Sequence, residues 1–214
     1  SGHRYIGLPY PLQQPGIQKD PGPVFRLAGV VVTSYYPAFL DLKDRLCVII
    51  GGGKVAEQKI RTLLDCDSRI TLISPQATST IQEWVACKRL TWHRRKYVSG
   101  DLKSVFLAIA ATNLPDLNRA IAKEAKEEKV LLNVVDNAPL CTFIAPAIVK
   151  RGEVTISIST GGTSPALARK LRETLEHSRI MDYADLAPLL SAARGEVKKR
   201  GLLIHPDQWQ KCIV

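Results

Sequence analysis

The stretch LCVIIGGGKVAEQKIRTLLDC, residues 46–66, joins an apolar run to three glycines and then to an amphipathic segment. Residues 46–50 are typical of a buried strand, and the pattern of residues 54–66 predicts a helix. A strand that turns directly into a helix at a glycine-rich corner is the start of a βαβ unit. The side chains that this helix would place on one apolar face are Val55, Ile60, Leu63 and Leu64.

The glycine corner matches a dinucleotide-binding turn. Gly51, Gly53 and Ala56 fit the pattern G-x-G-x-x-A. In that pattern the first glycine permits the tight turn, the second lets the backbone approach a pyrophosphate, and the third small residue lets helix and strand pack closely. The amino end of the helix adds free N–H groups and a positive dipole end. The alternative interpretation is a turn that serves packing alone.

The chain from residue 69 to residue 136 continues the alternation of strand and helix. Strand patterns at 69–73, 104–112 and 130–136 are separated by helix patterns at 79–88 and 115–129. Continuous apolar strands indicate burial on both faces, as in a parallel sheet. The sequence therefore predicts an α/β fold, a Rossmann-like parallel sheet with helices on both faces, followed by a small α+β module and a helical C-terminal tail.

We divide the chain into four parts. The first part, residues 1–34, is interrupted by five prolines and is expected to be an irregular or partly artificial extension. The second part, residues 35–143, is the nucleotide-binding domain. The third has a turn at Arg151-Gly152, an alternating strand, and a helix with Ser164 as N-cap and Pro165 at its first position. The boundaries are 1–34, 35–143, 144–178 and 179–214.

Composition narrows the class of protein. The chain has 214 residues, 45% of them hydrophobic, and a formal net charge of +10 that is spread along its length. No apolar run is long enough to span a bilayer. The five scattered cysteines argue against a disulfide framework or a structural zinc site and favour reduced thiols in a cytoplasmic protein. The charge could attract nucleic acid, a membrane surface or a polyanionic small molecule, or reflect nothing more than a basic protein.

The second strand lacks the acidic residue that usually binds the ribose of a dinucleotide. It is followed by Ser74, Pro75 and Gln76, with no arginine to suggest a 2′-phosphate. Ser74 or Gln76 could serve the ribose, and local chemistry does not decide between NAD and NADP. Thr112 and Asn113, after the strand at 104–112, either face the cofactor or form a simple turn into the next helix.

Two further sites follow the later strands. Asp136 ends the strand at 130–136, where a carboxylate could accept or relay a proton; a turn aspartate is the alternative. The segment STGGTSP, residues 159–165, opens a capped helix and offers an anion-friendly amino end with basic residues such as Arg169 beyond it. A carboxylate-bearing ligand would suit this place, although a well-capped surface helix has the same pattern.

Three stretches together resemble the precorrin-2 dehydrogenase family, which includes the dehydrogenase/ferrochelatase part of siroheme synthase. The resemblance covers about residues 36–180. It implies NAD-dependent oxidation of precorrin-2 to sirohydrochlorin, a homodimer formed largely by the segment at 144–178, and a cleft between the modules for a substrate rich in acetate and propionate carboxylates. The stretches are LDLKDRLCVIIGGGKVAEQKIRTLL (40–64), LAIAATN (107–113) and NVVDNAPLCTFIAPAIVKRGEVTISISTGGTSPALARKLRE (133–173).

The resemblance also implies roles for individual residues. Asp136 matches the family's catalytic aspartate, and Thr160 stands where some members carry a phosphorylatable serine, so that form of regulation is not expected. The family also lacks an acidic residue after the second strand, and this resemblance favours NAD as the cofactor. The residues predicted to bind the cofactor are Gly51, Gly52, Gly53, Lys54, Val55, Ser74, Pro75, Gln76, Thr112 and Asn113. Those predicted to bind the substrate are Asn137, Thr160, Gly161, Gly162, Thr163, Ser164 and Arg169.

Two other functions stay open. A bifunctional enzyme would also insert Fe²⁺ or Co²⁺ into sirohydrochlorin, with Asp136 aiding the transient metal, since no fixed metal-ligand cluster is visible. A non-enzymatic NAD-sensing or nucleic-acid-binding module is the third possibility, but WHRRKY at 92–97 is the only aromatic and basic cluster. We expect a homodimer and a tetrapyrrole substrate, and neither nucleic acid nor membrane as partner.

Overall fold

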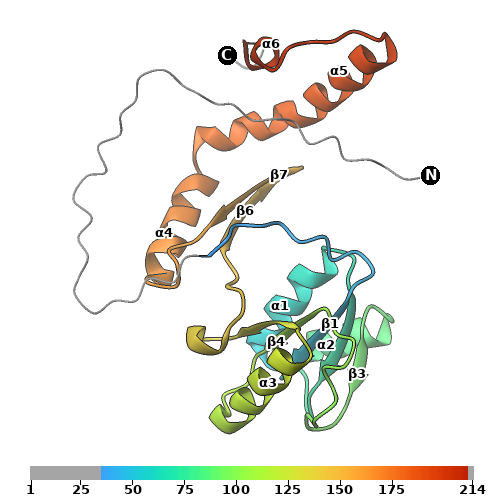
Figure 1. The fold of residues 1–214 in the computed structure, drawn as a ribbon, viewed down its shortest axis with the longest axis vertical. Helices are drawn as coiled ribbons and strands as arrows, with labels where there is room; N and C mark the ends of the chain where they lie inside the picture. The colour runs from blue at the N-terminus through green and yellow to red at the C-terminus, as the bar shows by residue number, and fades with distance from the viewer. Residues whose placement is uncertain (1–34, 212–214) are drawn as a thin grey trace. The chain divides into compact units, whose positions relative to one another are not determined.

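A computed structural model describes residues 35–211, without the side chains of Pro206, Asp207 and Gln210. The predicted extension 1–34 lies outside the described residues. Five parallel strands form one sheet in the order β3-β2-β1-β4-β5 (Figure 1). The strands are β1 (Leu46–Ile50), β2 (Arg69–Ile73), β3 (Thr91–His93), β4 (Leu107–Ala110) and β5 (Leu131–Val134).

The order of the strands places the glycine corner at the middle of the sheet. Ile50, the last residue of β1, pairs with Ile73 of β2 on one side and with Ala110 of β4 on the other. Val134 of β5 pairs in turn with Ala110. The carboxyl ends of four strands therefore meet at one edge of the sheet. The chain adds β2 and β3 on one side of β1, and β4 and β5 on the other. The edge beside β1 is the place where open parallel sheets bind ligands.

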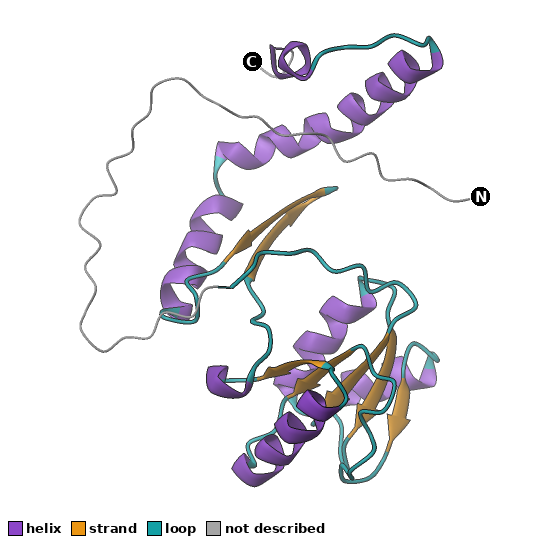
Figure 2. Cartoon of the chain, viewed as in Figure 1, coloured by secondary structure: helices purple, strands orange, loops and turns teal. Residues whose placement is uncertain are grey.

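Helices cover both faces of the sheet, as predicted (Figure 2). The helices α1 (Lys54–Leu64) and α2 (Ser79–Ala86) contribute to one apolar cluster, and α3 (Pro115–Glu127) to the other. On α1 the buried apolar side chains are Ala56, Ile60 and Leu63, whereas Val55 is 42% exposed. Placing Val55 on the core face was wrong, because one residue of helix turns the side chain by about 100° from the line that Ala56 occupies.

A hairpin and a helical tail follow the sheet. The short 3₁₀ turn η1 (Ala138–Leu140) leads to β6 (Ala147–Arg151) and β7 (Val154–Ile158), an antiparallel pair. Helix α4 (Pro165–Glu176) packs on β6, and the hydroxyl of Ser164 accepts the predicted capping bond from the N–H of Leu167 at 3.2 Å. The tail contains η2 (Arg179–Leu186), α5 (Ala187–Lys199) and α6 (Pro206–Lys211). Within residues 35–211, no helix combines the length and the apolar character that crossing a bilayer requires.

Candidate functional site

The first two glycines of the corner are required by packing. Gly51 has φ +106°, and a Cβ there would lie 2.2 Å from the carbonyl oxygen of Ala111. A Cβ on Gly52 would lie 2.0 Å from the carbonyl oxygen of Gln76. The backbones after β1, β2 and β4 therefore approach so closely that side chains are excluded between them. This explains two of the three glycines without any ligand.

The third glycine faces open space. Among residues 35–211, apart from its neighbours in the chain, no atom lies within 4 Å of the position that a Cβ on Gly53 would take, and its φ of −84° suits any residue. Gly53 is the N-cap of α1, and no side chain among the described residues caps this end. The first N–H groups of a helix have no partner within the helix, so they can bind an anion that approaches over Gly53. The corner thus fits the pyrophosphate of a dinucleotide.

The buried carboxylate of Glu57 stabilises the glycine corner through hydrogen bonds. Glu57 is 8% exposed and accepts hydrogen bonds from the Thr78 hydroxyl at 2.7 Å and from the Lys54 ammonium at 3.1 Å. These two bonds, the first above all, lower the pKa of Glu57. Sequence reasoning missed Glu57 and Thr78, although a threonine directly before a helix is a recognisable N-cap signal. The ammonium of Lys54, a predicted cofactor contact, is held by this carboxylate.

Several other predicted cofactor residues have structural partners. The buried Ser74 donates its hydroxyl proton to the carbonyl of Gln76 at 2.7 Å. The hydroxyl of Thr112 donates to Asn118 at 2.9 Å, a bond that braces the turn into α3. Both hydroxyls could meet a ribose only as acceptors, because their protons are already donated. Pro75, Gln76 and Asn113 are exposed, and their predicted contacts with the cofactor stay predictions.

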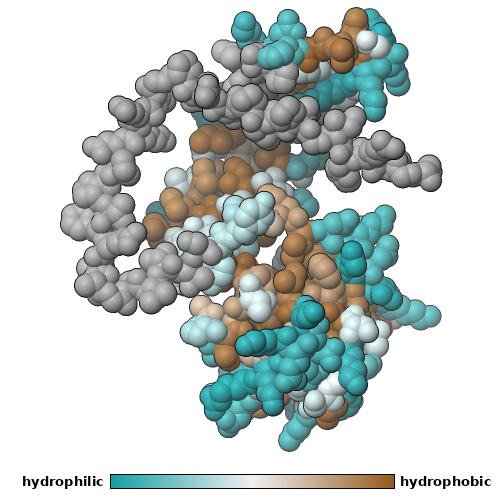
Figure 3. Space-filling view, in the orientation of Figure 1, coloured by the Kyte–Doolittle hydropathy of each residue, from teal (hydrophilic) through white to brown (hydrophobic). Residues whose placement is uncertain are grey.

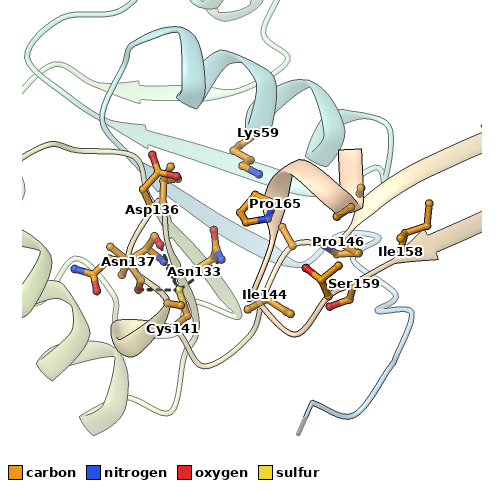
Figure 4. A pocket seen from close by; sticks show the side chains of 18 residues that line it. Lys59, Asn133, Asp136, Asn137, Cys141, Ile144, Pro146, Ile158, Ser159 and Pro165 are labelled. Carbon is orange, nitrogen blue, oxygen red and sulfur yellow. Dashed lines mark hydrogen bonds between the residues drawn. The ribbon is translucent and has the colours of Figure 1, made fainter. Parts of the chain in front are cut away.

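A second concavity opens where the chain leaves the sheet for the hairpin. It has a volume of about 420 Å³. Asp136 and Asn137 line it from the loop after β5 (Figure 4). Thr160 and Gly162 line it from the turn between β7 and α4. Asp136 is exposed, with φ +57°. The structure thus brings the predicted catalytic carboxylate together with three of the predicted substrate residues.

The remaining predicted substrate residues, Gly161, Thr163, Ser164 and Arg169, do not line the cavity, and the turn before α4 is closed by its own hydrogen bonds. Thr160 donates its hydroxyl proton to the carbonyl of Ser164 at 3.1 Å, and Thr163 donates to the carbonyl of Thr160 at 2.6 Å. Gly161 donates its N–H to the hydroxyl of Ser159 at 3.1 Å. Arg169 is exposed on α4 outside the cavity. The turn is held by its own bonds, and substrate contact by these residues stays a prediction.

Cys141 anchors the loop that carries Asp136. Its sulfur accepts the N–H of Val134 at 3.1 Å and lies 3.3 Å from the carbonyl oxygens of Val134 and Asn137, either of which can accept the thiol proton (Figure 4). Burial raises the pKa of the Cys141 thiol, so it stays a protonated donor. Nothing in the sequence separated Cys141 from the other scattered cysteines.

Only two charged side chains line the cavity within the described part of the chain: Asp136 and Lys59. Lys59 reaches it from α1 and was also missed by sequence reasoning, since its position on an amphipathic helix carries no signal of its own (Figure 4). A proton acceptor and an ammonium group in one cavity, beside a nucleotide-type corner, suit a polar ligand that undergoes proton loss. Strand order and corner together define a dinucleotide-binding protein of Rossmann type.

Comparison with known proteins agrees with that class and narrows it. Residues 38–147 match the family described as "Putative NAD(P)-binding", and residues 151–178 match that described as "Sirohaem biosynthesis protein central". A siroheme synthase of Nitrosomonas europaea is 38% identical over 184 residues, 84% of this chain and 38% of that protein. A siroheme synthase of Pseudoalteromonas atlantica is 42% identical over 142 residues, 66% of this chain and 31% of that protein.

A solved structure, SirC, precorrin-2 dehydrogenase, superposes with a TM-score of 0.68 at 28% identity, covering 84% of this chain and 87% of that one. The chain belongs to the precorrin-2 dehydrogenase family, as the resemblance predicted. It spans about a third of the length of the siroheme synthases that it matches. The prediction of a nicotinamide dinucleotide, NAD, as cofactor agrees with the description of the matching family.

Proposed function

We propose that this chain is an NAD-dependent precorrin-2 dehydrogenase that oxidises precorrin-2 to sirohydrochlorin. The observation that carries the proposal is the position of Asp136. It lies in a cavity at the carboxyl edge of the same sheet whose central strand ends in the glycine corner. One edge of the sheet thus offers a cofactor cradle after β1 and a carboxylate after β5, with only β4 between these two strands.

In this function NAD⁺ would accept the hydride. The chain supplies binding and proton transfer. The open backbone at Gly53 and the first turn of α1 hold the pyrophosphate, and the Glu57–Thr78 pair keeps that turn in place. Asp136 accepts the proton that the tetrapyrrole loses, directly or through a water molecule. The cysteine-anchored loop keeps the carboxylate at the cavity.

We also propose that the chain acts as a homodimer joined through the hairpin and α4. Large apolar side chains are exposed there: Ile148 is 42% exposed, Leu167 50% and Leu171 42%. Figure 3 shows brown, hydrophobic atoms gathered over the region of α4 and the hairpin. Large apolar side chains that stay exposed in one chain are candidates for burial by a partner surface. Light scattering on purified protein should give twice the mass of the chain.

The experiment that tests the proposed activity is an anaerobic incubation with precorrin-2 and NAD⁺ in the absence of metal. We expect NADH and sirohydrochlorin to form in equal amounts. Asp136→Asn should lower the rate by about a hundredfold, the usual weight of a general base. Asp116→Asn, on the exposed start of α3, is the matched control and should keep the wild-type rate. Absence of NADH with bound NAD⁺ would contradict the proposal, and adding Fe²⁺ afterwards tests chelation separately.

A further inference from the structure

The basic side chains of α1 divide into two kinds. The Lys54 ammonium lies 3.1 Å from the carboxylate of Glu57, and the Arg61 guanidinium lies 4.0 Å from it. Arg61 also stacks on the ring of Trp84, at 5.7 Å. Both cations are therefore engaged with Glu57 of the same helix, and Arg61 also contacts Trp84 of α2. Lys59, between them, forms no ion pair with any described residue and instead lines the cavity that contains Asp136.

We infer that Lys59 binds a carboxylate of the tetrapyrrole and so positions the macrocycle against Asp136. This inference rests on the proposed function, because it takes a substrate rich in carboxylates as given. Lys59 is the only cation among the cavity residues that the structure describes, and it is half-buried. A partly desolvated ammonium binds a carboxylate through a charge-assisted hydrogen bond.

The two charged side chains of the cavity, Lys59 and Asp136, come from different elements and can serve different functions. Lys59 reaches the cavity from α1, whereas Asp136 lines it from the loop after β5 (Figure 4). No ion pair joins these two described residues, so Asp136 is left free to accept a proton and Lys59 is left free to hold an anion. A ligand that bridges the cavity would meet both groups with different parts of itself.

The anion that Lys59 binds is not the pyrophosphate of the cofactor. That group is expected over Gly53, at the amino end of α1, and neither Gly53 nor Lys54 lines the cavity. Lys59 lies six residues after Gly53, about 9 Å along the helix axis at 1.5 Å per residue. One rigid helix would then hold the cofactor by its first turn and the substrate by its second, which sets the distance between the two ligands.

The test measures binding of sirohydrochlorin, the expected product, so that no turnover is needed. Wild-type protein is compared with Lys59→Met, with Lys59→Arg, and with Lys123→Met, which removes the same charge from α3. We expect the Kd of Lys59→Met to rise roughly tenfold, as for loss of one charge-assisted bond in a half-exposed site. Lys59→Arg should regain most of the affinity, and Lys123→Met should match wild type.

Two further readouts separate ligand binding from a structural role. The Kd for NAD⁺ and the thermal midpoint should be the same in all four proteins. The affinity for sirohydrochlorin should depend less on salt in Lys59→Met than in wild type, because one ionic contact is gone. If Lys59→Met folds poorly, Lys59→Gln replaces it.

Unchanged sirohydrochlorin affinity in Lys59→Met, or an equal loss in Lys123→Met, would overturn the inference. So would a parallel loss of NAD⁺ binding or failure of wild-type protein to bind sirohydrochlorin. The proposed activity can fail independently of this inference. If wild-type protein binds sirohydrochlorin through Lys59 but forms no NADH from precorrin-2, the carboxylate site is supported and the dehydrogenase activity is contradicted. NADH formation together with unaltered binding in Lys59→Met keeps the dehydrogenase and removes Lys59 from the substrate site.

Discussion

The hydroxyl of Thr78 donates a 2.7 Å hydrogen bond to the buried carboxylate of Glu57, 21 residues earlier in the chain. Thr78 is also the N-cap of α2 and accepts the N–H of Ile81 at 3.4 Å. Its own N–H donates to the carbonyl of Gly52 at 3.0 Å. One residue therefore ties together the helix after the glycine corner, the corner itself and the helix after β2.

Thr78→Val should weaken both the fold and NAD⁺ binding. The variant loses the cap of α2, which costs about 1 kcal/mol of unfolding free energy, and leaves the Glu57 carboxylate with one donor fewer. We expect a lower urea midpoint together with a severalfold higher Kd for NAD⁺. Thr78→Ser is the control, because it keeps the hydroxyl. Wild-type stability and wild-type NAD⁺ affinity in Thr78→Val would show that the hydroxyl bonds contribute to neither.

Alanine at two glycines of the corner should separate folding from cofactor binding. Gly51→Ala places a Cβ 2.2 Å from a backbone oxygen at φ +106°, so we expect it to lower the unfolding free energy by more than about 2 kcal/mol. The methyl group of Gly53→Ala meets no non-neighbouring atom of the described residues, so stability should hold while the methyl group obstructs the pyrophosphate. Calorimetry of NAD⁺ binding and urea unfolding measure the two effects. Normal NAD⁺ affinity in Gly53→Ala would place the cofactor elsewhere.

Removing the thiol of Cys141 should slow turnover without changing the affinity for NAD⁺. Cys141→Ala frees the loop of Asp136 from its sulfur-centred bonds to Val134 and Asn137, so the carboxylate is less well held at the cavity. A fall in kcat of roughly tenfold is expected from imperfect placement of a general base. Cys141→Ser keeps a donor and acceptor and should lie between Cys141→Ala and wild type. A kcat that is unaffected in Cys141→Ala would show that the loop needs no anchor.

Glu124 should make the fold sensitive to acid. Burial alone would raise the pKa of its carboxyl, but bonds from the Tyr97 hydroxyl at 2.7 Å and from the N–H groups of Leu102 and Gly100 lower it overall. A lowered folded-state pKa contributes stability above the unfolded-state value of about 4.5, and that contribution disappears as the pH falls through the folded-state value. Burial and the bond to Glu124 raise the pKa of Tyr97, so its contribution is present below pH 10 and fades as the pH rises beyond it.

Glu124→Gln should therefore lower the unfolding free energy at pH 7 by about 1–2 kcal/mol and flatten its decline below pH 5. Tyr97→Phe should cost less at pH 7 and flatten the decline above pH 10. Urea unfolding from pH 3 to pH 11 measures both slopes. Glu127→Gln, on the exposed end of α3, is the matched control. A wild-type acid slope in Glu124→Gln would assign the acid sensitivity to other carboxylates.

Local patterns were sufficient for most of the fold. The run at 46–50, the glycine corner and the helix after it could be predicted because strand, turn and helix each depend on neighbouring residues. The same holds for the cap at Ser164 and the hairpin turn at Arg151-Gly152. The error at Val55 arose because an apolar residue next to a helix start can face either solvent or core, and only the packed sheet decides which.

The class of fold, the dinucleotide corner and the family could be read from the sequence, because each depends on short stretches whose patterns are recognisable before the chain is folded. Only the tertiary structure brought Lys59, Asp136 and Thr160 to one cavity, joined Glu57 to Thr78, and placed the thiol of Cys141 behind the loop of Asp136. Those relationships depend on strand order and on the path of the chain between distant segments. The free energy of packing the whole sheet sets both, and no local pattern encodes it.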